Sequence, residues 1–151
     1  MSTHSASPIP ERRNHPSATT PALSTDGIVT GSVHTWLRLE GLTLLVAAMW
    51  GFAYTGSSWW LFATLLLAPD LGALGYLHSR RAGTHLYNLA HTTAIPAGLA
   101  ALGLAAHHTM VLAIGLIWLA HIGMDRTMNY GLKYTDDFGH THLGWHGSAS
   151  H

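Results

Sequence analysis

A histidine and an aspartate lie four residues apart, at His121 and Asp125, where the last long apolar stretch of the chain ends. In a helix this spacing places both side chains on one face. Neutral imidazole and carboxylate are ligands that Zn²⁺ and similar divalent metals take in proteins, and a catalytic site keeps a further position open for water. The pair therefore predicts half of a divalent metal site, whose other ligands come from elsewhere in the chain.

Further ionisable residues lie at a comparable depth in the other apolar stretches. Asp70 follows Pro69 near the end of the second stretch, His91 lies near the start of the third, and Glu40 lies near the start of the first. At a rise of ~1.5 Å per residue, these three residues and His121 lie on the order of 6–10 Å inside one boundary of a membrane. An ionisable side chain within a span costs about 2.5–3.5 kcal/mol, so such groups normally face one another or a wet cavity. The predicted metal ligands are Asp70, His91, His121 and Asp125.

Polar residues near the predicted metal ligands are candidates for catalysis and substrate binding. Glu40 and Tyr87 are the candidates for catalytic acid or base, or for hydrogen-bonding support of a ligand. The residues predicted to bind substrate, chiefly by holding an anionic head group, are Arg38, Asn88, Arg126 and Lys133. The most economical chemistry is hydrolysis of a lipid-linked or amphipathic small molecule by a water molecule that the metal activates.

Three alternatives remain open at this stage. The same histidines and aspartates could form a structural network with Arg38 or Arg126 that fixes helix register in a non-enzymatic interaction, proton-handling or solute-handling protein. Arg38 could extend toward the membrane surface without touching a substrate. His91 and His121 could also be the axial ligands of a haem.

Composition limits the other classes of function. The sequence has 151 residues, of which 48% are apolar and 9% charged, and it contains no cysteine. Disulfides, thiolate nucleophiles and cysteine-ligated metals are therefore excluded. A formal net charge of zero and the absence of a glycine-rich phosphate loop argue against nucleic acid as a partner.

Apolar stretches at 36–55, 57–77, 86–106 and 109–128 are each close to the ~20 residues that a membrane-spanning helix needs. They predict an all-α fold, a four-helix transmembrane bundle embedded in the lipid bilayer, over residues 34–130. Residues 1–33 are predicted to be a disordered cytoplasmic tail. Residues 131–151 are predicted to be a cytoplasmic segment that closes over the site as a lid, with His140 and His142 as further candidate ligands.

The basic residues predict the orientation of the chain. All seven lie before the first stretch or at its start, between the second and third, or at the end of the fourth and beyond it: Arg12, Arg13, Arg38, Arg80, Arg81, Arg126 and Lys133. By the positive-inside rule both termini are then cytoplasmic. Small residues within the stretches allow close helix packing, which also suits a homo-oligomer.

Several segments together carry a resemblance to a known family. They read LRLEG, SSWWLFATLLLAPDLGALGYL, YNLAHT, IWLAHIGMDRTMNYGLKY and FGHTHLG. The chain is similar over residues 36–144 to the bacterial membrane family catalogued as domain of unknown function 4260. The resemblance implies a multi-pass protein of the bacterial inner (plasma) membrane and brings no established activity. Where the family's FG-x-THLG ending has an acidic residue, this chain has His140.

Overall fold

The computed structural model describes residues 27–146, which are helical from Gly31 to Thr127 apart from short connections and end in a loop segment with one small hairpin. The predicted all-α fold is confirmed. The helices are α1 (Gly31–Tyr54), α2 (Trp59–Leu65), the 3₁₀ helix η1 (Ala68–Leu77), α3 (Arg80–His91), α4 (Ala94–Ala105) and α5 (Thr109–Thr127). Strands β1 (His140–Thr141) and β2 (Gly144–Trp145) form the hairpin. Of the predicted tail 1–33, residues 1–26 lie outside the described part, and residues 31–33 already belong to α1.

The four predicted apolar stretches correspond to four helical segments, two of which are interrupted. The second consists of α2 followed by η1, and the third runs through the end of α3 and all of α4. Pro69 lies in the first turn of η1 and Pro96 in the first turn of α4. A proline ring clashes with the carbonyl four residues earlier, so an unbroken α-helix across either position is unfavourable. The breaks therefore fall just before these prolines, and the third stretch is not one continuous helix.

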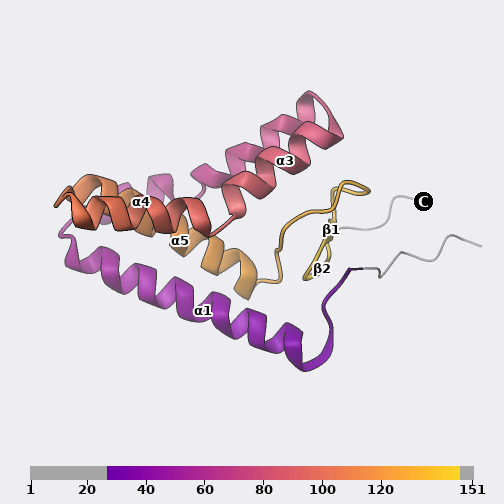
Figure 1. The fold of residues 1–151 in the computed structure, drawn as a ribbon, viewed down its shortest axis with the longest axis horizontal. Coiled ribbons are helices and arrows are strands. Elements are labelled where there is room, and N and C mark those ends of the chain that lie inside the picture. The colour runs from indigo at the N-terminus through magenta and orange to yellow at the C-terminus, as the bar shows by residue number, and fades with distance from the viewer. Residues whose placement is uncertain (1–26, 147–151) are drawn as a thin grey trace, which may run out of the picture.

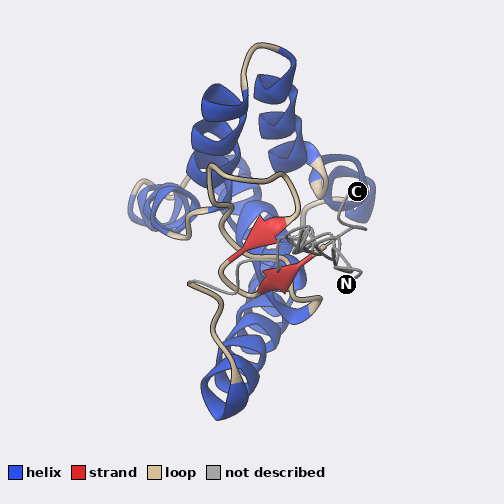
Figure 2. Cartoon of the chain, turned by 90° about the vertical axis from the view of Figure 1, so that its right-hand side faces the viewer, coloured by secondary structure: helices blue, strands red, loops and turns tan. Residues whose placement is uncertain are grey.

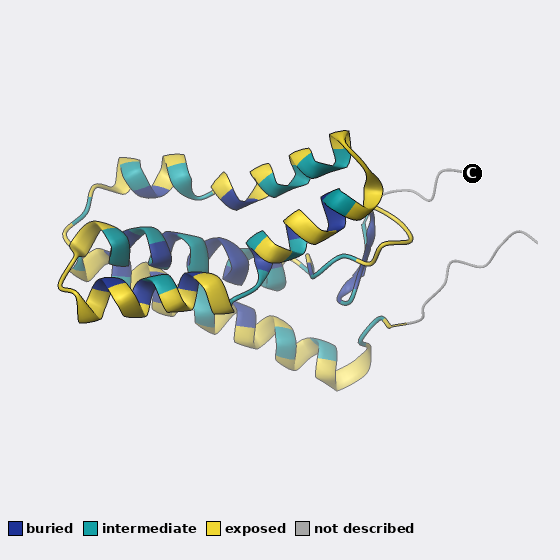
Figure 3. Cartoon of the chain, turned by 45° about the horizontal axis from the view of Figure 1, so that its top comes forward, coloured by how far each residue is buried: buried dark blue, intermediate teal, exposed yellow. Residues whose placement is uncertain are grey.

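Helix α5 is the central element of the bundle and packs against both α1 and α4 (Figure 1). Glycines bring the backbones together: a Cβ on Gly123 would lie 2.5 Å from the Leu45 nitrogen of α1, and one on Gly115 would lie 2.6 Å from the Ala100 nitrogen of α4. Figure 3 shows the result, with buried residues concentrated on α5 and exposed ones on the outer faces of the other helices. Small residues allow this packing where lipid supplies no hydrophobic drive between helices.

An aromatic cluster closes the end of the bundle where α1 leads into α2. The ring of the buried Phe52 lies 5.0 Å from that of Phe62 and 5.1 Å from that of Trp59, in edge-to-face arrangements that aromatic rings prefer. Ala113 and Ile117 of α5 belong to the same core. This core fixes α2 against α5, so that the chain enters η1 at a defined point.

Helices η1 and α3 pair with each other, and α3 extends away from the α1–α4–α5 bundle (Figure 1). A Cβ on Gly75 of η1 would lie 3.0 Å from Gly83 Cα of α3, so the two helices touch with almost no side chain between them. The pair meets the rest of the bundle at the interrupted ends, beside Asp70 and His91.

Three helical segments are long and apolar enough to cross a membrane, namely 31–54, 59–77 and 109–127. The length and composition of these segments indicate a membrane protein. The third predicted stretch is divided at Thr92 and Thr93 between α3 and α4, which have 12 residues each and are too short to span alone.

The segment after α5 folds back beside α3 and the beginning of α1 (Figures 1 and 2). Its β1–β2 hairpin is extended by a bridge between Lys133 and Thr141. The Val29 amide, just before α1, donates to the His142 carbonyl at 2.9 Å. The C-terminal segment is therefore hydrogen-bonded to the start of the described chain.

Candidate metal centre

Four side chains from three helices converge at the interrupted ends of the second and third segments. The Nε2 atoms of His91 and His121 lie 3.0 Å apart. His91 Nε2 lies 3.4 Å from Asp70 Oδ1 and 3.3 Å from Asp125 Oδ2, and His121 Nε2 lies 3.6 Å from each of the same two oxygens. We call these four residues the His/Asp group; one ligand atom from each lies within 4.8 Å of every other.

The distances between the histidine and carboxylate atoms are close to those of a tetrahedral ligand set, and the two Nε2 atoms lie somewhat closer together. With metal–ligand bonds of about 2.0–2.1 Å, the corners of a tetrahedron lie about 3.3–3.4 Å apart. The histidine–carboxylate distances of 3.3–3.6 Å bracket that value. Two imidazoles with two carboxylates are a donor set that suits Zn²⁺ and related divalent ions.

His91 is oriented by the backbone of its own helix. Its Nδ1 lies 2.8 Å from the Tyr87 carbonyl, one turn earlier in α3. A carbonyl only accepts, so Nδ1 carries the proton and, in the neutral ring, Nε2 is left with its lone pair facing the group. This second hydrogen bond is the usual way in which proteins fix the tautomer of a ligating histidine.

No cation of the protein neutralises the two carboxylates directly. Among residues 27–146, each recorded ion pair joins a carboxylate to a histidine, and neither Arg38 nor Arg126 lies within ion-pair distance of Asp70 or Asp125. With neutral rings, the four ligand atoms share one proton, that of His121 on Nε2, which can donate to His91 Nε2, and a bound cation would neutralise the two carboxylates. A structural network built on arginine is not formed here.

Three of the four side chains of the His/Asp group are buried, and the fourth is partly exposed. His91, His121 and Asp125 are buried, whereas the Asp70 side chain is 49% exposed. Asp70 follows the break before η1, and His91 is the last residue of α3, whose terminal carbonyls favour a cation. Water or a substrate would reach the group on the Asp70 side.

Asn88 links α3, the helix that carries His91, to the C-terminal segment. Its amide NH₂ donates to the Lys133 carbonyl at 2.9 Å, and its carbonyl accepts from the Lys133 amide at 2.7 Å. The side chain thereby imitates a β-strand partner for one residue. Asn88, predicted to bind substrate, contacts the protein's own backbone and positions Lys133.

Lys133 ends among aromatic rings beside the His/Asp group. Its Nζ lies 3.2 Å from the ring centroid of Phe138 and 4.4 Å from that of Tyr87, within cation–π range. Tyr87 in turn stacks on the His91 ring, with centroids 3.7 Å apart. Burial lowers the pKa of the Lys133 ammonium to about 8, although the Asp70, Asp125 and Asp137 carboxylates attract its charge.

The low pKa of Lys133 predicts unusual reactivity, and Lys133 is the single lysine of the sequence. With a folded-state pKa of about 8, its neutral amine is present well below the ordinary lysine value of about 10.4. Acylation by a succinimidyl ester, followed at this residue by peptide mapping, should rise with a midpoint near pH 8. Asp70→Asn removes a carboxylate that favours the charged form, so the midpoint should move lower still. A midpoint equal to that of the unfolded chain would contradict the buried position.

The remaining predicted residues lie at varied distances from the group. Arg38 donates to the Thr127 carbonyl at 2.9 Å and so caps α5, and Arg126 donates to Thr93 Oγ1 at 3.4 Å, across the break between α3 and α4. Glu40 is exposed on α1 and the structure does not bring it to the His/Asp group, so its acid–base role stays a prediction.

The two histidines of the C-terminal segment do not join the His/Asp group. His140 is buried and its Nδ1 lies 2.7 Å from Asp136 Oδ2, while Nδ1 of His142 accepts from the Leu132 amide at 2.9 Å. Both stabilise the fold of the segment. A haem between His91 and His121 does not fit this arrangement, because Nε2 atoms 3.0 Å apart leave no room for a macrocycle between them.

Two further residues that shape the site, Trp118 and Pro96, were not predicted from the sequence. Trp118 donates from Nε1 to the Ala90 carbonyl at 2.6 Å and so satisfies the exposed end of α3 next to His91. Pro96 determines where α3 stops. The proline was a readable signal, because it lies inside an apolar stretch that was expected to be one helix.

The comparisons with known proteins give one match. The family model described as "Domain of unknown function (DUF4260)" matches residues 34–145, which include every residue of the His/Asp group. Neither the search of curated proteins nor the search of solved structures found a match.

Proposed function

The chain belongs to the family described as Domain of unknown function (DUF4260), and on that premise we propose that it is a metal-dependent membrane hydrolase acting on a lipid-like or amphipathic substrate. The His/Asp group holds the metal, and Asp70, His91, His121 and Asp125 are its ligands. One observation carries the proposal: four ligand atoms meet with no protein cation among them, and their histidine–carboxylate distances are close to those around a tetrahedral ion.

The donor set also favours this chemistry over electron transfer. Imidazole and carboxylate are hard or borderline ligands, which suit a Lewis acid such as Zn²⁺. A bound divalent ion supplies a water nucleophile at neutral pH and polarises the bond to be cleaved. The chain's own residues keep the other sides of the group dry, because His91, His121 and Asp125 are buried.

The half-exposed Asp70 lies on the side from which a substrate would reach the proposed metal centre. Its position in a 3₁₀ helix after a break, instead of inside a long α-helix, lets this carboxylate move with less disturbance than Asp125 would cause in α5. If a metal is bound, His91, His121 and Asp125 would hold it from the buried side, and Asp70 would be the ligand nearest to an incoming substrate. Lys133 and Tyr87 lie on the same side, where they can stabilise charge on the substrate.

We place the His/Asp group toward the cytoplasm. All seven basic residues lie before the first apolar stretch, or at or beyond the stretch ends that the positive-inside rule assigns to that side. Lys133 and Arg126, close to the group, belong to this set.

The test is metal content and activity of untagged protein purified in a neutral detergent. About one tightly held divalent ion per chain is expected for a site with four protein ligands. A screen of amphiphilic esters, amides and phosphoesters should give hydrolysis that a chelator abolishes and Zn²⁺ restores. Protein that holds no ion at micromolar free Zn²⁺ would overturn the proposal.

A second candidate function has one observation in its favour. Two interrupted helical segments meet at the His/Asp group, as discontinuous helices do at the cation sites of many transporters. A cation- or proton-handling protein would show ion flux in proteoliposomes, lost in Asp125→Asn, without any hydrolytic activity.

A further inference from the structure

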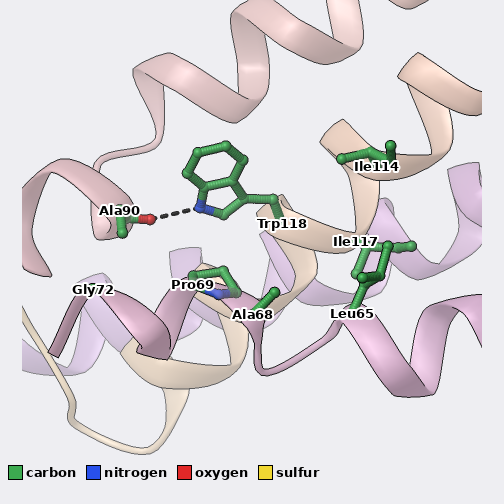
Figure 4. A pocket seen from close by; sticks show the side chains of 8 residues that line it. All are labelled: Leu65, Ala68, Pro69, Gly72, Ala90, Ile114, Ile117 and Trp118. Carbon is green, nitrogen blue, oxygen red and sulfur yellow. Dashed lines mark hydrogen bonds between the residues drawn. The ribbon is translucent and has the colours of Figure 1, made fainter. Parts of the chain in front are cut away.

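An apolar hollow of about 340 Å³ lies beside the His/Asp group, between α2, η1, α3 and α5 (Figure 4). Its walls are almost entirely hydrocarbon: Leu65, Ala68, Pro69, Gly72, Ala90, Ile114, Ile117 and Trp118. The size is at the lower end of the range for small-molecule sites, which is roughly 300–1,000 Å³. The Trp118 indole forms one wall and is held there by its hydrogen bond to the Ala90 carbonyl (Figure 4).

The hollow and Lys133 lie toward opposite ends of the His/Asp group. Along η1, Pro69 lines the hollow, Asp70 is a ligand, and Tyr76 lies under the Lys133 ammonium at 5.4 Å. Helix α5 gives the same order from hollow to ligand: Ile114 and Trp118 line the hollow, and the ligands His121 and Asp125 follow within two turns. On α3, the ring of Tyr87 lies under the Lys133 ammonium at 4.4 Å. A molecule lying along η1 and α5 would pass from hydrocarbon, across the ligands, toward the positive charge of Lys133.

We propose that this path binds a single-chain amphiphile with an anionic head group, its hydrocarbon chain in the Trp118 hollow and its head group at Lys133. The inference rests on the proposed function and narrows its substrate. The bond presented to the metal is the one that joins an apolar chain to a negatively charged head.

The head group, and not the chain, must supply most of the affinity. Lipid tails are as apolar as the walls of the hollow, so a chain gains little by leaving the bilayer. A charged head group near an ammonium that lies half buried among rings gains more, because attraction between charges is stronger away from bulk water. Lys133 forms no ion pair within 4 Å among the described residues, so its charge is available.

The experiment uses bromine quenching of tryptophan fluorescence with metal-loaded protein in neutral micelles. The probes are a long-chain carboxylate brominated on the chain and the brominated alcohol of the same length. The difference between wild type and Trp118→Phe isolates the signal from the hollow. Saturable quenching by the carboxylate is expected, and Lys133→Met should weaken it about tenfold, the usual scale for losing a bond to a charged group. Quenching by the alcohol should be weak and insensitive to that change.

Two matched variants test the hollow itself. Ala68→Phe fills it and should abolish the carboxylate signal. Gly98→Phe adds the same ring on α4, where a Cβ has no neighbour within 4 Å, and should leave the signal unchanged. Equal quenching by carboxylate and alcohol, unaffected by Ala68→Phe, would overturn the inference, because the hollow would then hold only detergent.

Failure here can be separated from failure of the proposed function. A bound metal without head-group discrimination overturns the amphiphile path and leaves the metal centre standing. Saturable, Lys133-dependent quenching in protein that holds no metal supports the path and removes the hydrolase.

Discussion

His121→Ala should empty the His/Asp group, so that purified protein carries no divalent ion where the wild type carries one per chain. His121 is completely buried, and its Nε2 lies within 3.6 Å of ligand atoms from the other three residues, so no outside group can replace it. Asp125→Ala should have the same effect, because it removes the buried carboxylate. His85→Ala on the exposed face of α3 is the matched control and should keep the ion.

The loss should also be visible in thermal stability. An ion present at 1,000 times its dissociation constant stabilises the folded state by about 4 kcal/mol, and both variants should lose this gain. The measurement is the unfolding temperature in detergent with a chelator and with added Zn²⁺. Wild type should respond to Zn²⁺ and the two variants should not. Lowering the pH should weaken the wild-type response, since protons compete for the ligands.

A purely structural network predicts the opposite pattern of unfolding temperatures. It would give a wild-type unfolding temperature that ignores Zn²⁺, while each truncation would cost roughly 3–5 kcal/mol by leaving a buried partner unpaired. Unchanged metal content in both alanine variants would equally reject the assigned ligands.

Gly123→Ala should strongly destabilise the bundle, although alanine is the better helix former. An added Cβ would lie 2.5 Å from the Leu45 nitrogen and 2.7 Å from the Gly41 carbonyl oxygen, which are backbone atoms that cannot turn aside. Helix α1 would have to move away from α5, at a cost of about 1–3 kcal/mol for overpacking. Asp125 lies two residues further along α5, so weaker metal binding should accompany the loss.

The control variant for this prediction should change stability in the opposite direction. Gly98→Ala in α4 meets no atom within 4 Å and should stabilise by up to about 1 kcal/mol through helix propensity alone. Unfolding of both variants in mixed detergent would measure the contrast. If Gly123→Ala proved as stable as Gly98→Ala, the close crossing of α1 and α5 would be wrong.

Depth along each apolar stretch was enough to predict the members of the His/Asp group. Asp70, His91 and His121 lie at one level because each is a similar number of residues from the end of its stretch, and Asp125 follows His121 by one turn. Counting residues gives the level of a side chain in the membrane. It does not give the direction in which that side chain points, which depends on how each helix is rotated.

Glu40 is a case in which depth along the stretch does not predict the contacts of a side chain. It lies in the same predicted layer, but α1 turns Gly41, Ala48 and Phe52 toward its neighbours and leaves Glu40 exposed. The spacing of these small and buried residues is the signal that would have marked the inner face of α1. Asn88 and Lys133 could not have been paired from sequence, because 45 residues separate them and only the tertiary fold brings them together.

The order of the ligands along the chain has a consequence for biosynthesis. Asp70 and His91 leave the ribosome before α5, which carries His121 and Asp125, has been made. A carboxylate placed alone in the bilayer costs about 2.5–3.5 kcal/mol on insertion scales. We therefore expect the nascent η1–α3 pair to stay at the membrane surface until α5 has been inserted. Maturation of the centre is then a late event of membrane insertion, and a chain truncated before α5 would lack it.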